Sequence, residues 1–175
     1  MKIKGYAVVV VWVCMSVVWS CSKPARQLPS NKVQSEDAAV TMTLVNMRLA
    51  EEADRQCTEY VKQSGLPFVL EDCSCWLLLN RRTENDLLQL GEKVSFVTTV
   101  SLLDSTLIDN SEVVLEIGKN DNLPCFDYLL QLLHEGEEAT AVVPYYLAYG
   151  KDGNGKAPAL ANCLITFENI KTLNE

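Results

Sequence analysis

Hydrophobic residues recur at helical intervals between residues 37 and 64. Apolar positions are three or four residues apart, and charged residues stand between them. This spacing places the apolar side chains on one face of a helix. Gly65 and Pro67, which follow, are typical of the end of a helix. The pattern predicts a helical arm over residues 37–65, with an apolar face made of Leu49, Ala53, Cys57, Tyr60 and Val61.

Segments with the composition of β-strands make up most of the remaining chain. They are short, contain many Val, Leu, Ile and Thr residues, and are separated by polar turns. Such a series is typical of an antiparallel sheet. The predicted strands cover residues 68–71, 73–80, 93–103, 113–117, 138–143 and 163–170.

One short helical pattern interrupts the strands. It lies in "CFDYLLQLLHEGE", residues 125–137, where Gly136 ends the pattern. Its apolar face needs a sheet to cover it. We therefore expect an α+β domain over residues 66–175, in which a bent antiparallel sheet wraps on one short helix. The helix would contribute Phe126, Leu129, Leu130 and Leu133 to the core.

The first 20 residues have the features of a secretory leader. Lys2 and Lys4 precede the apolar run "YAVVVVWVCMSVVWS", which is short for a membrane span. Cys21 follows directly, and with Val18 three residues before it the site resembles a bacterial lipobox. We expect lipidation of Cys21 and a flexible polar tether over residues 21–36. An ordinary signal peptide or a single membrane anchor is the alternative.

The charge balance disfavours one class of partner. The sequence contains 15 Lys and Arg residues against 23 Asp and Glu residues, a formal net charge of −8. Loss of Lys2 and Lys4 with the leader would leave the chain more acidic still. An acidic chain repels phosphate backbones, so nucleic-acid binding is not expected. Attachment to a membrane would depend on acyl chains at Cys21.

Five cysteines remain after the leader and the expected lipidation site. An odd number leaves at least one thiol unpaired in a compartment that permits disulfides. The "CSC" stretch lacks the spacing of a redox CxxC motif, and with one histidine, His134, in the chain a zinc site has little support. Two small buried cysteines are the preferred interpretation of Cys73 and Cys75, and a thiol oxidoreductase is the alternative. The pairing of the five stays open: Cys57, Cys73, Cys75, Cys125 and Cys163.

The order of motifs in the second half of the chain resembles a known family. "GEKVSFVTTVSLLDSTLIDNS" at 91–111, "EIGKNDNLPCFDYLLQLLHEGEEATAVVP" and "LAYGKDGNGKAPALANCLITFENI" follow one another in the family's sequence of motifs. This part of the chain is similar to FKBP-type peptidyl-prolyl cis-trans isomerases. The preceding "EYVKQSG" at 59–65 also resembles the arm found before this domain in lipoproteins of Bacteroidota.

The resemblance implies a fold and a reaction. The expected fold is an FKBP-like sheet wrapped on one short helix, and the expected reaction is rotation about an X–Pro bond, whose barrier is about 18–20 kcal/mol. An apolar pocket disfavours the charge-separated amide, and a hydrogen-bond donor stabilises the twisted one. This chemistry needs no cofactor and no metal. The expected partners are proline-containing polypeptides.

Six residues stand at positions of the family's site, and the match there is partial. Tyr149, in "AYG", stands where the family has the tyrosine that donates a hydrogen bond to the substrate carbonyl, and Asp109 stands at the pocket aspartate. We take these two as the catalytic residues. The last pocket position is Phe167 when the asparagine at 162 is aligned, or Thr166 when the spacing is counted without a gap. The resemblance implies a substrate-binding wall made of Ile108, Leu123, Phe126 and Phe167.

Other positions depart from the family pattern. Thr98 replaces a tyrosine, Asn122 a valine, Ser105 a turn glycine and Ala159 a proline, while Ile108 replaces a phenylalanine. Two functions therefore stay open. The first is an isomerase, lipid-anchored in the cell envelope and facing the periplasm, that assists the folding of exported proteins. The second is a non-catalytic binding or chaperone lipoprotein with an eroded pocket.

The stretch "VPYYLAYGKDGNGKAP" contains three tyrosines with different expected roles. Tyr145 and Tyr146 are neighbours at a strand end and would face opposite ways, so at most one could face the pocket, and both are expected to pack or lie at the surface. Tyr149 would lie at the pocket rim. The glycine-containing loop after it would form a flap over a bound proline.

Overall fold

The computed structural model describes residues 31–119 and 122–173, with side chains from residue 39 onward. The expected leader and the lipidation site Cys21 lie outside these residues. The chain divides into two compact units between Met42 and Thr43, and the second unit contains the domain described below. Within the described residues, no helix is both long enough and apolar enough to cross a bilayer.

Helix α2 (Asn31–Ser64) contains the predicted arm and begins six residues before the predicted start. Its predicted apolar face is confirmed, because Ala53, Cys57 and Val61 are buried at four-residue intervals. Gly65 ends the helix with a φ of +65°, a left-handed conformation that glycine adopts without strain. The side-chain hydroxyl of Ser64 donates to the carbonyl of Val61 and helps to close the last turn.

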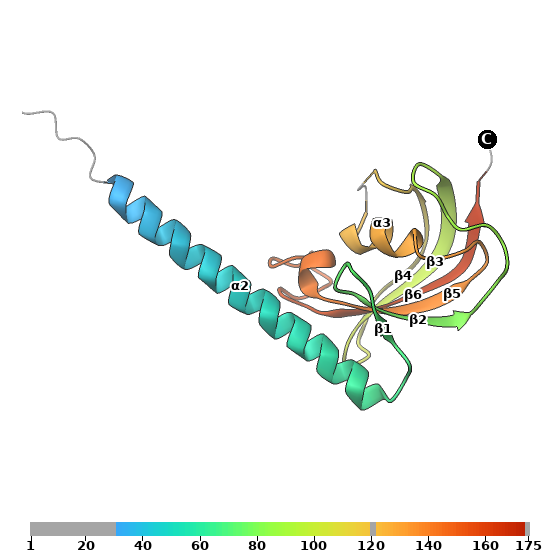
Figure 1. Ribbon diagram of the computed structural model, residues 1–175, viewed down its shortest axis with the longest axis horizontal. Coiled ribbons are helices and arrows are strands. Elements are labelled where there is room, and N and C mark those ends of the chain that lie inside the picture. The colour runs from blue at the N-terminus through green and yellow to red at the C-terminus, as the bar shows by residue number, and fades with distance from the viewer. Residues whose placement is uncertain (1–30, 120–121, 174–175) are drawn as a thin grey trace, which may run out of the picture. The chain divides into compact units, whose positions relative to one another are not determined.

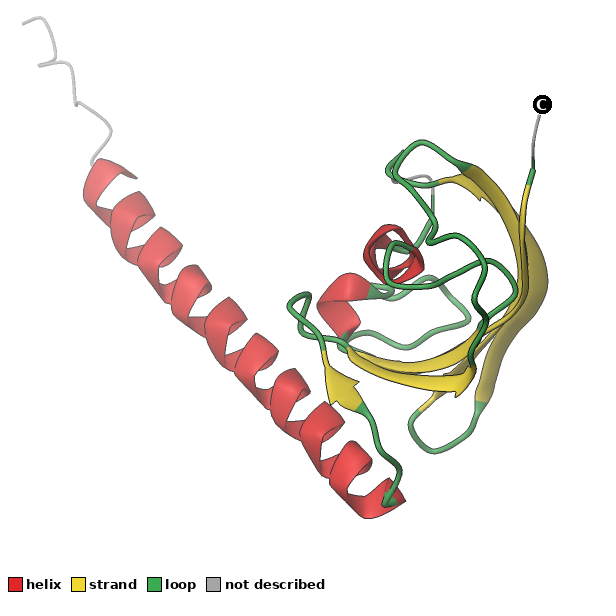
Figure 2. Cartoon of the chain, turned by 45° about the vertical axis from the view of Figure 1, so that its right-hand side comes forward, coloured by secondary structure: helices red, strands yellow, loops and turns green. Residues whose placement is uncertain are grey.

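Six strands of the described residues form one antiparallel sheet in the order β1-β2-β5-β6-β3-β4. The sheet curves around helix α3, which lies against its concave face (Figures 1 and 2). This arrangement confirms the expected bent sheet wrapped on one short helix. The strands are β1 (Val69–Leu70), β2 (Trp76–Arg81), β3 (Lys93–Leu102), β4 (Leu107–Glu116), β5 (Glu138–Val143) and β6 (Cys163–Thr172).

Strand β4 is longer than predicted. It begins at Leu107 rather than at residue 113, because the chain reverses directly after β3 in a tight turn. Asp104 Oδ1 accepts a hydrogen bond from the Thr106 N–H at 2.9 Å, and Ser105 takes the positive φ of +71° that the replaced glycine would adopt. The hairpin places Asp109 opposite Val100 of β3.

Helix α3 (Pro124–Leu130) is shorter than predicted. The four residues predicted for its apolar face are buried, although Leu133 lies after the end of the helix. The helix ends at Leu130 instead of continuing to Gly136, since the following residues turn back and His134 forms an antiparallel bridge with Leu87. Gly136, with a φ of +78°, lies instead in the turn before β5, where its N–H donates to the carbonyl of Ile170.

The outer face of the sheet packs against the C-terminal part of α2. Cys57 and Val61 of the helix form a small cluster with Val142 of β5, and Trp76 and Leu164 pack on it. Asn162 adds polar contacts to the same helix. Its Nδ2 donates to Gln56 Oε1 at 3.0 Å, while its Oδ1 accepts from the Tyr145 N–H at 2.9 Å.

Candidate functional site

Three phenylalanine rings form the floor of the predicted site. Phe96 of β3, Phe126 of α3 and Phe167 of β6 contact one another with ring centroids 5.4–5.6 Å apart. Phe126 packs edge-to-face on both other rings, while Phe96 and Phe167 are tilted by 44°, and edge-to-face pairs stabilise aromatic clusters beyond the area they bury. Phe126 and Phe167 were expected here from the sequence, whereas Phe96 was missed. Its signal was the two-residue alternation of β3, which buries Val94, Phe96, Thr98 and Val100 on one face.

The predicted aliphatic wall lies beside this floor. Ile108 of β4 is buried in the same core cluster as Phe126 and Phe167, and Leu123, the residue before α3, packs half-buried against it. Thr166, the other possibility for the last pocket position, pairs with Thr99 and Thr140. Adjacent residues on a strand face opposite sides, so Phe167, and not Thr166, points at the aromatic floor.

Tyr149 lies half-buried against the same core. Among the described residues its hydroxyl has no hydrogen-bond partner. Burial raises the pKa of the Tyr149 hydroxyl to about 12, with smaller contributions from Cys163 and from the carboxylate of Asp109. The hydroxyl therefore stays protonated at neutral pH and can donate to a carbonyl oxygen brought against it.

Asp109 is held by two neighbours. Its Oδ1 accepts from Lys156 Nζ at 2.9 Å and its Oδ2 accepts from the Ser111 hydroxyl at 2.8 Å. The hydrogen bond from Lys156, followed by that from Ser111, lowers the pKa of the Asp109 carboxyl. Asp109 is therefore an anion at neutral pH, neutralised in part by Lys156. The sequence pattern gave no indication of this ion pair.

The loop that presents Lys156 is internally hydrogen-bonded. Asn154 Oδ1 accepts from the N–H groups of Lys156 and Ala157, at 3.1 and 2.8 Å, and the Asn154 N–H donates to the Ala157 carbonyl. Gly153 has a φ of +70°, and a Cβ there would lie 2.3 Å from the Ala157 carbonyl oxygen. Only glycine fits this position. The loop expected to act as a flap is thus a defined turn that directs Lys156 at Asp109.

The five departures from the family pattern differ in their surroundings. Thr98 is 2% exposed and its hydroxyl is buried without a hydrogen-bond partner among the described residues. Asn122 and Ala159 are exposed, and Ser105 adopts a positive φ in the turn between β3 and β4. Thr98 and Ile108 are therefore the departures that lie in the interior of the domain, and Thr98 is the one that brings a polar group there.

Tyr145 and Tyr146 lie in a short 3-10 helix, η1 (Tyr145–Leu147), and not at a strand end. Tyr145 is buried, and its ring packs edge-to-face on that of Tyr146 at 5.5 Å. The Tyr146 hydroxyl donates to Asp54 Oδ1 of α2 at 2.6 Å. Both tyrosines pack, as expected, and Tyr146 helps to attach the helix to the domain.

The five cysteines are all free thiols. Burial raises the pKa of the thiols of Cys57, Cys75, Cys125 and Cys163, which keeps them protonated and poorly nucleophilic. Cys75 is buried and Cys73 half-buried, in the turn before β2. Within the described part of the chain, no three potential ligands are grouped so that they could hold a metal ion.

Comparison with known families identifies the domain. Residues 85–168 match the family of FKBP-type peptidyl-prolyl cis-trans isomerases. The chain contains an FKBP-type domain. The match begins before β3, ends within β6 and includes every residue of the predicted site, so the resemblance read from the motifs is confirmed for the family.

Solved structures share the fold of the FKBP-type domain. FkpA from Escherichia coli is 16% identical, with a TM-score of 0.58, and the alignment covers 98% of this chain and 81% of that one. A peptidyl-prolyl cis-trans isomerase from Pseudomonas syringae pv. tomato is 15% identical, with a TM-score of 0.58 and coverage of 71% and 94%. AtFKBP13 is 16% identical, with a TM-score of 0.55 and coverage of 58% and 94%. At sequence identities of 15–16%, the structural similarity shows a shared fold and nothing further.

Proposed function

We propose that this chain is a peptidyl-prolyl cis-trans isomerase that acts on proline-containing polypeptides. The observation that carries the proposal is the Tyr149 hydroxyl. It is protonated, it has no hydrogen-bond partner among the described residues, and its side chain packs against the core that contains the Phe96, Phe126 and Phe167 rings. A prolyl ring would rest against the apolar wall, and the carbonyl before it would accept a hydrogen bond from Tyr149.

The remaining residues would favour the twisted amide in two ways. Apolar side chains of Ile108, Leu123 and Phe126 exclude water, which weakens the charge-separated form of the amide. The donor at Tyr149 stabilises the carbonyl oxygen of the transition state. Asp109, an anion near this hydroxyl, sets the local charge, and Lys156 and Ser111 hold it in place. Neither the exclusion of water nor the hydrogen bond from Tyr149 requires a nucleophile.

A protease-coupled assay with a short proline peptide tests the proposal. Uncatalysed isomerisation takes tens of seconds or longer, so a faster, catalysed isomerisation is easily distinguished from it. The wild-type chain should accelerate the slow phase in proportion to its concentration. A double variant, Tyr149→Phe with Asp109→Ala, should lose most of this acceleration. Equal rates for wild type and double variant would refute the enzyme proposal.

A non-catalytic binding or chaperone module is the second candidate. This candidate is favoured by the burial of the aromatic floor, since the side chains of Phe126 and Phe167 are 3% and 0% exposed and leave little surface for a prolyl ring. The Thr98 hydroxyl, which has no partner in the described part of the chain, also marks a change inside the domain. If this candidate is correct, the chain suppresses aggregation of an unfolded protein while the isomerase assay gives the same rate for wild type and double variant.

We further propose that the protein is lipid-anchored in the cell envelope, facing the periplasm, where it assists the folding of exported proteins. The support is the sequence before Cys21, which lies outside the described residues. Mass spectrometry of the mature N-terminus should find an acylated Cys21. Cys21→Ser should release the protein from the membrane fraction, and unchanged fractionation would contradict the anchor.

A further inference from the structure

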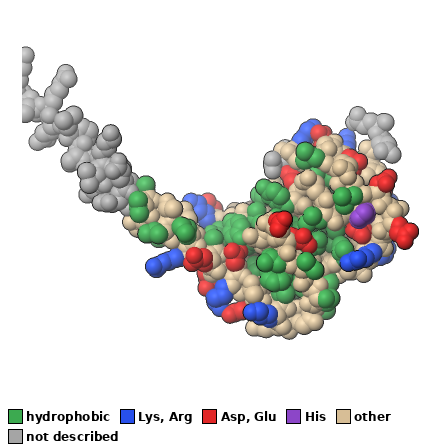
Figure 3. Space-filling model, viewed as in Figure 1, with side chains coloured by type: hydrophobic (Ala, Val, Ile, Leu, Met, Phe, Trp, Pro, Cys, Tyr) green, Lys and Arg blue, Asp and Glu red, His purple; other side chains and the backbone are tan. Residues whose placement is uncertain are grey.

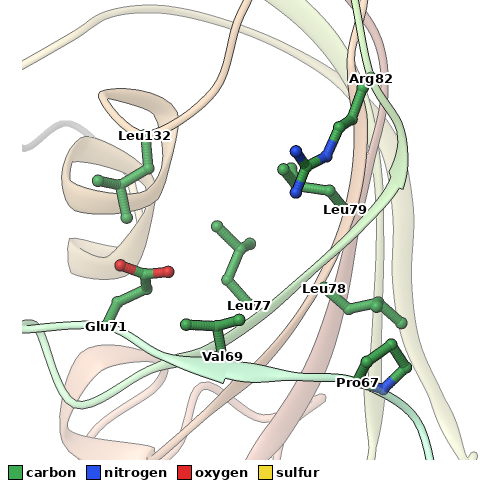
Figure 4. A pocket seen from close by; sticks show the side chains of 8 residues that line it. All are labelled: Pro67, Val69, Glu71, Leu77, Leu78, Leu79, Arg82 and Leu132. Atoms are coloured by element: carbon green, nitrogen blue, oxygen red, sulfur yellow. The ribbon is translucent and has the colours of Figure 1, made fainter.

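An apolar pocket lies outside the candidate isomerase site. It has a volume of about 450 Å³ and opens beside strands β1 and β2, near the C-terminal end of α3 (Figure 4). None of the six predicted site residues lines it. Its lining consists of Pro67, Val69, Glu71, Leu77, Leu78, Leu79, Arg82 and Leu132.

The alternation of two paired strands creates this surface. Pro67, Val69 and Glu71 are two residues apart, so an extended backbone presents them on one side. Val69 pairs with Leu77 across the β1–β2 ladder, which places these two side chains next to each other. Val69 is 59% exposed, and Leu132, which points into the pocket from the segment after α3, is 41% exposed.

Apolar side chains are exposed on both sides of β1. Leu66 and Leu70 alternate with the pocket residues and are exposed on the other side of the extended backbone, and Figure 3 shows hydrophobic side chains gathered on one face of the domain. Contiguous exposed apolar area is uncommon on a protein without a partner. A ligand that covers this face therefore needs aliphatic groups at more than one position.

Two charged side chains stand on opposite sides of the opening. Glu71 and Arg82 flank the aliphatic residues (Figure 4). Neither forms an ion pair or a side-chain hydrogen bond with another described residue. Nearby Arg81, in contrast, pairs with Glu138 at 3.0 Å. The pocket thus offers one free cation and one free anion to a ligand that carries opposite charges.

The backbone beside the pocket favours an extended ligand. β1 is the outermost strand of the sheet and pairs with β2 on one side only. Its other edge presents backbone N–H and C=O groups that a further strand can use. A fatty acid or another small apolar molecule would leave these groups and one of the two charges without a partner. A polypeptide segment can satisfy all of them.

We propose that this pocket is a second polypeptide-binding site. It takes an extended, proline-free segment with alternating aliphatic residues, which adds to the edge of β1, seats side chains among Val69, Leu77 and Leu132, and places an acidic residue at Arg82. The site does not require an active isomerase. In a chain that acts on unfolded polypeptides, it would hold a second part of the same molecule and raise the effective concentration of the first.

Fluorescence anisotropy with the full chain tests this proposal. The probe is a labelled heptapeptide in which valine alternates with threonine and one end carries aspartate; a second probe carries lysine instead. Arg82→Glu should weaken binding of the aspartate probe about tenfold and strengthen binding of the lysine probe, because a charge pair is exchanged for a repulsion. Leu132→Asn should weaken binding of both probes.

Two controls separate this site from the isomerase site and from a general loss of folding. Leu107→Asn changes a side chain that is 62% exposed on β4, at the opposite edge of the sheet, and should leave both affinities unchanged. The Tyr149→Phe, Asp109→Ala double variant should also bind both probes normally, so a failure of the isomerase proposal leaves this result intact.

Three outcomes would overturn the proposal. Equal affinity of wild type, Arg82→Glu and Leu132→Asn for the aspartate probe would show that the peptide binds elsewhere. Binding of decanoate without binding of either peptide would assign the pocket to a lipid-like ligand. A dimer in sedimentation equilibrium that Leu132→Asn dissociates would assign the face to a second copy of the chain.

Discussion

Lys156 Nζ lies 2.9 Å from Asp109 Oδ1, although the two residues are 47 positions apart in the chain. The contact joins the loop after Tyr149 to the strand that carries the pocket aspartate. It therefore places a positive charge beside the aspartate of the predicted site. Since the lysine side chain is 68% exposed and that of the aspartate 32%, the pair is expected to contribute at most about 1 kcal/mol to stability.

Lys156→Met should therefore change the site more than the fold. The hydrogen bond from Lys156 is the main cause of the lowered pKa of Asp109, so this pKa should rise toward its ordinary value in the variant. A carboxyl with a lowered folded-state pKa adds stability above its unfolded pKa and loses it as the pH falls through the folded one. The variant should lose less stability on acidification than the wild type.

NMR titration of the Asp109 carboxyl carbon measures this pKa directly, and thermal unfolding between pH 3 and pH 7 measures the linkage. Lys151→Met serves as the control, since Lys151 lies in the same loop and is exposed. An Asp109 pKa that is identical in wild type and in Lys156→Met would mean that the ion pair is not formed in solution.

Tyr149→Phe should lower kcat/KM for a proline peptide about tenfold, the effect of one lost hydrogen bond to a neutral carbonyl. Its stability should change little, because the Tyr149 hydroxyl has no partner among the described residues. Tyr146→Phe is the matched control. It removes the hydroxyl that donates to Asp54 and should cost about 1 kcal/mol of stability with no loss of rate. The reverse pattern would assign the donor role to Tyr146.

The ionisation of Tyr149 gives a further expectation. Burial raises the pKa of its hydroxyl to about 12, so the donor should persist well above pH 10, where an ordinary tyrosine is half ionised. A raised pKa in the folded state means that its contribution to stability is complete below pH 10 and is lost as the pH rises toward 12. The difference in ultraviolet absorbance between wild type and Tyr149→Phe follows this titration, and a midpoint near pH 10 would contradict the burial.

Thr98→Val should stabilise the domain by about 1 kcal/mol, since it replaces a buried hydroxyl that lacks a partner within residues 39–119 and 122–173 with a methyl group of similar size. The neighbouring Thr99→Val is its control. Thr99 Oγ1 accepts a hydrogen bond from Asn110 Nδ2 at 2.7 Å, so that variant should lose stability. Urea denaturation measures both changes. A destabilised Thr98→Val would reveal a partner for the hydroxyl, such as a buried water.

Local periodicity was enough to predict the elements of this domain. Spacings of three to four residues predict the apolar stripe of α2 and the buried face of α3. A spacing of two residues predicts the bounds of β5. Phe126, Phe167, Ile108, Leu123 and Tyr149 could be placed from motifs whose order matches the family. Within such a motif, neighbouring residues already determine which side chain faces the core.

Contacts between distant segments were decided by the tertiary structure alone. Phe96 joins the aromatic floor because the register of β3 with β6 brings it against Phe167, and Lys156 reaches Asp109 because the turn at Gly153 directs it there. Neither the register of two distant strands nor the direction of a loop is encoded in a local spacing. The pocket between Glu71 and Arg82 depends in the same way on how β1 pairs with β2 and on where α3 ends. The sequence by itself thus determined the elements and the residue types of the predicted site, whereas the charge of that site and the surfaces around it arose from packing.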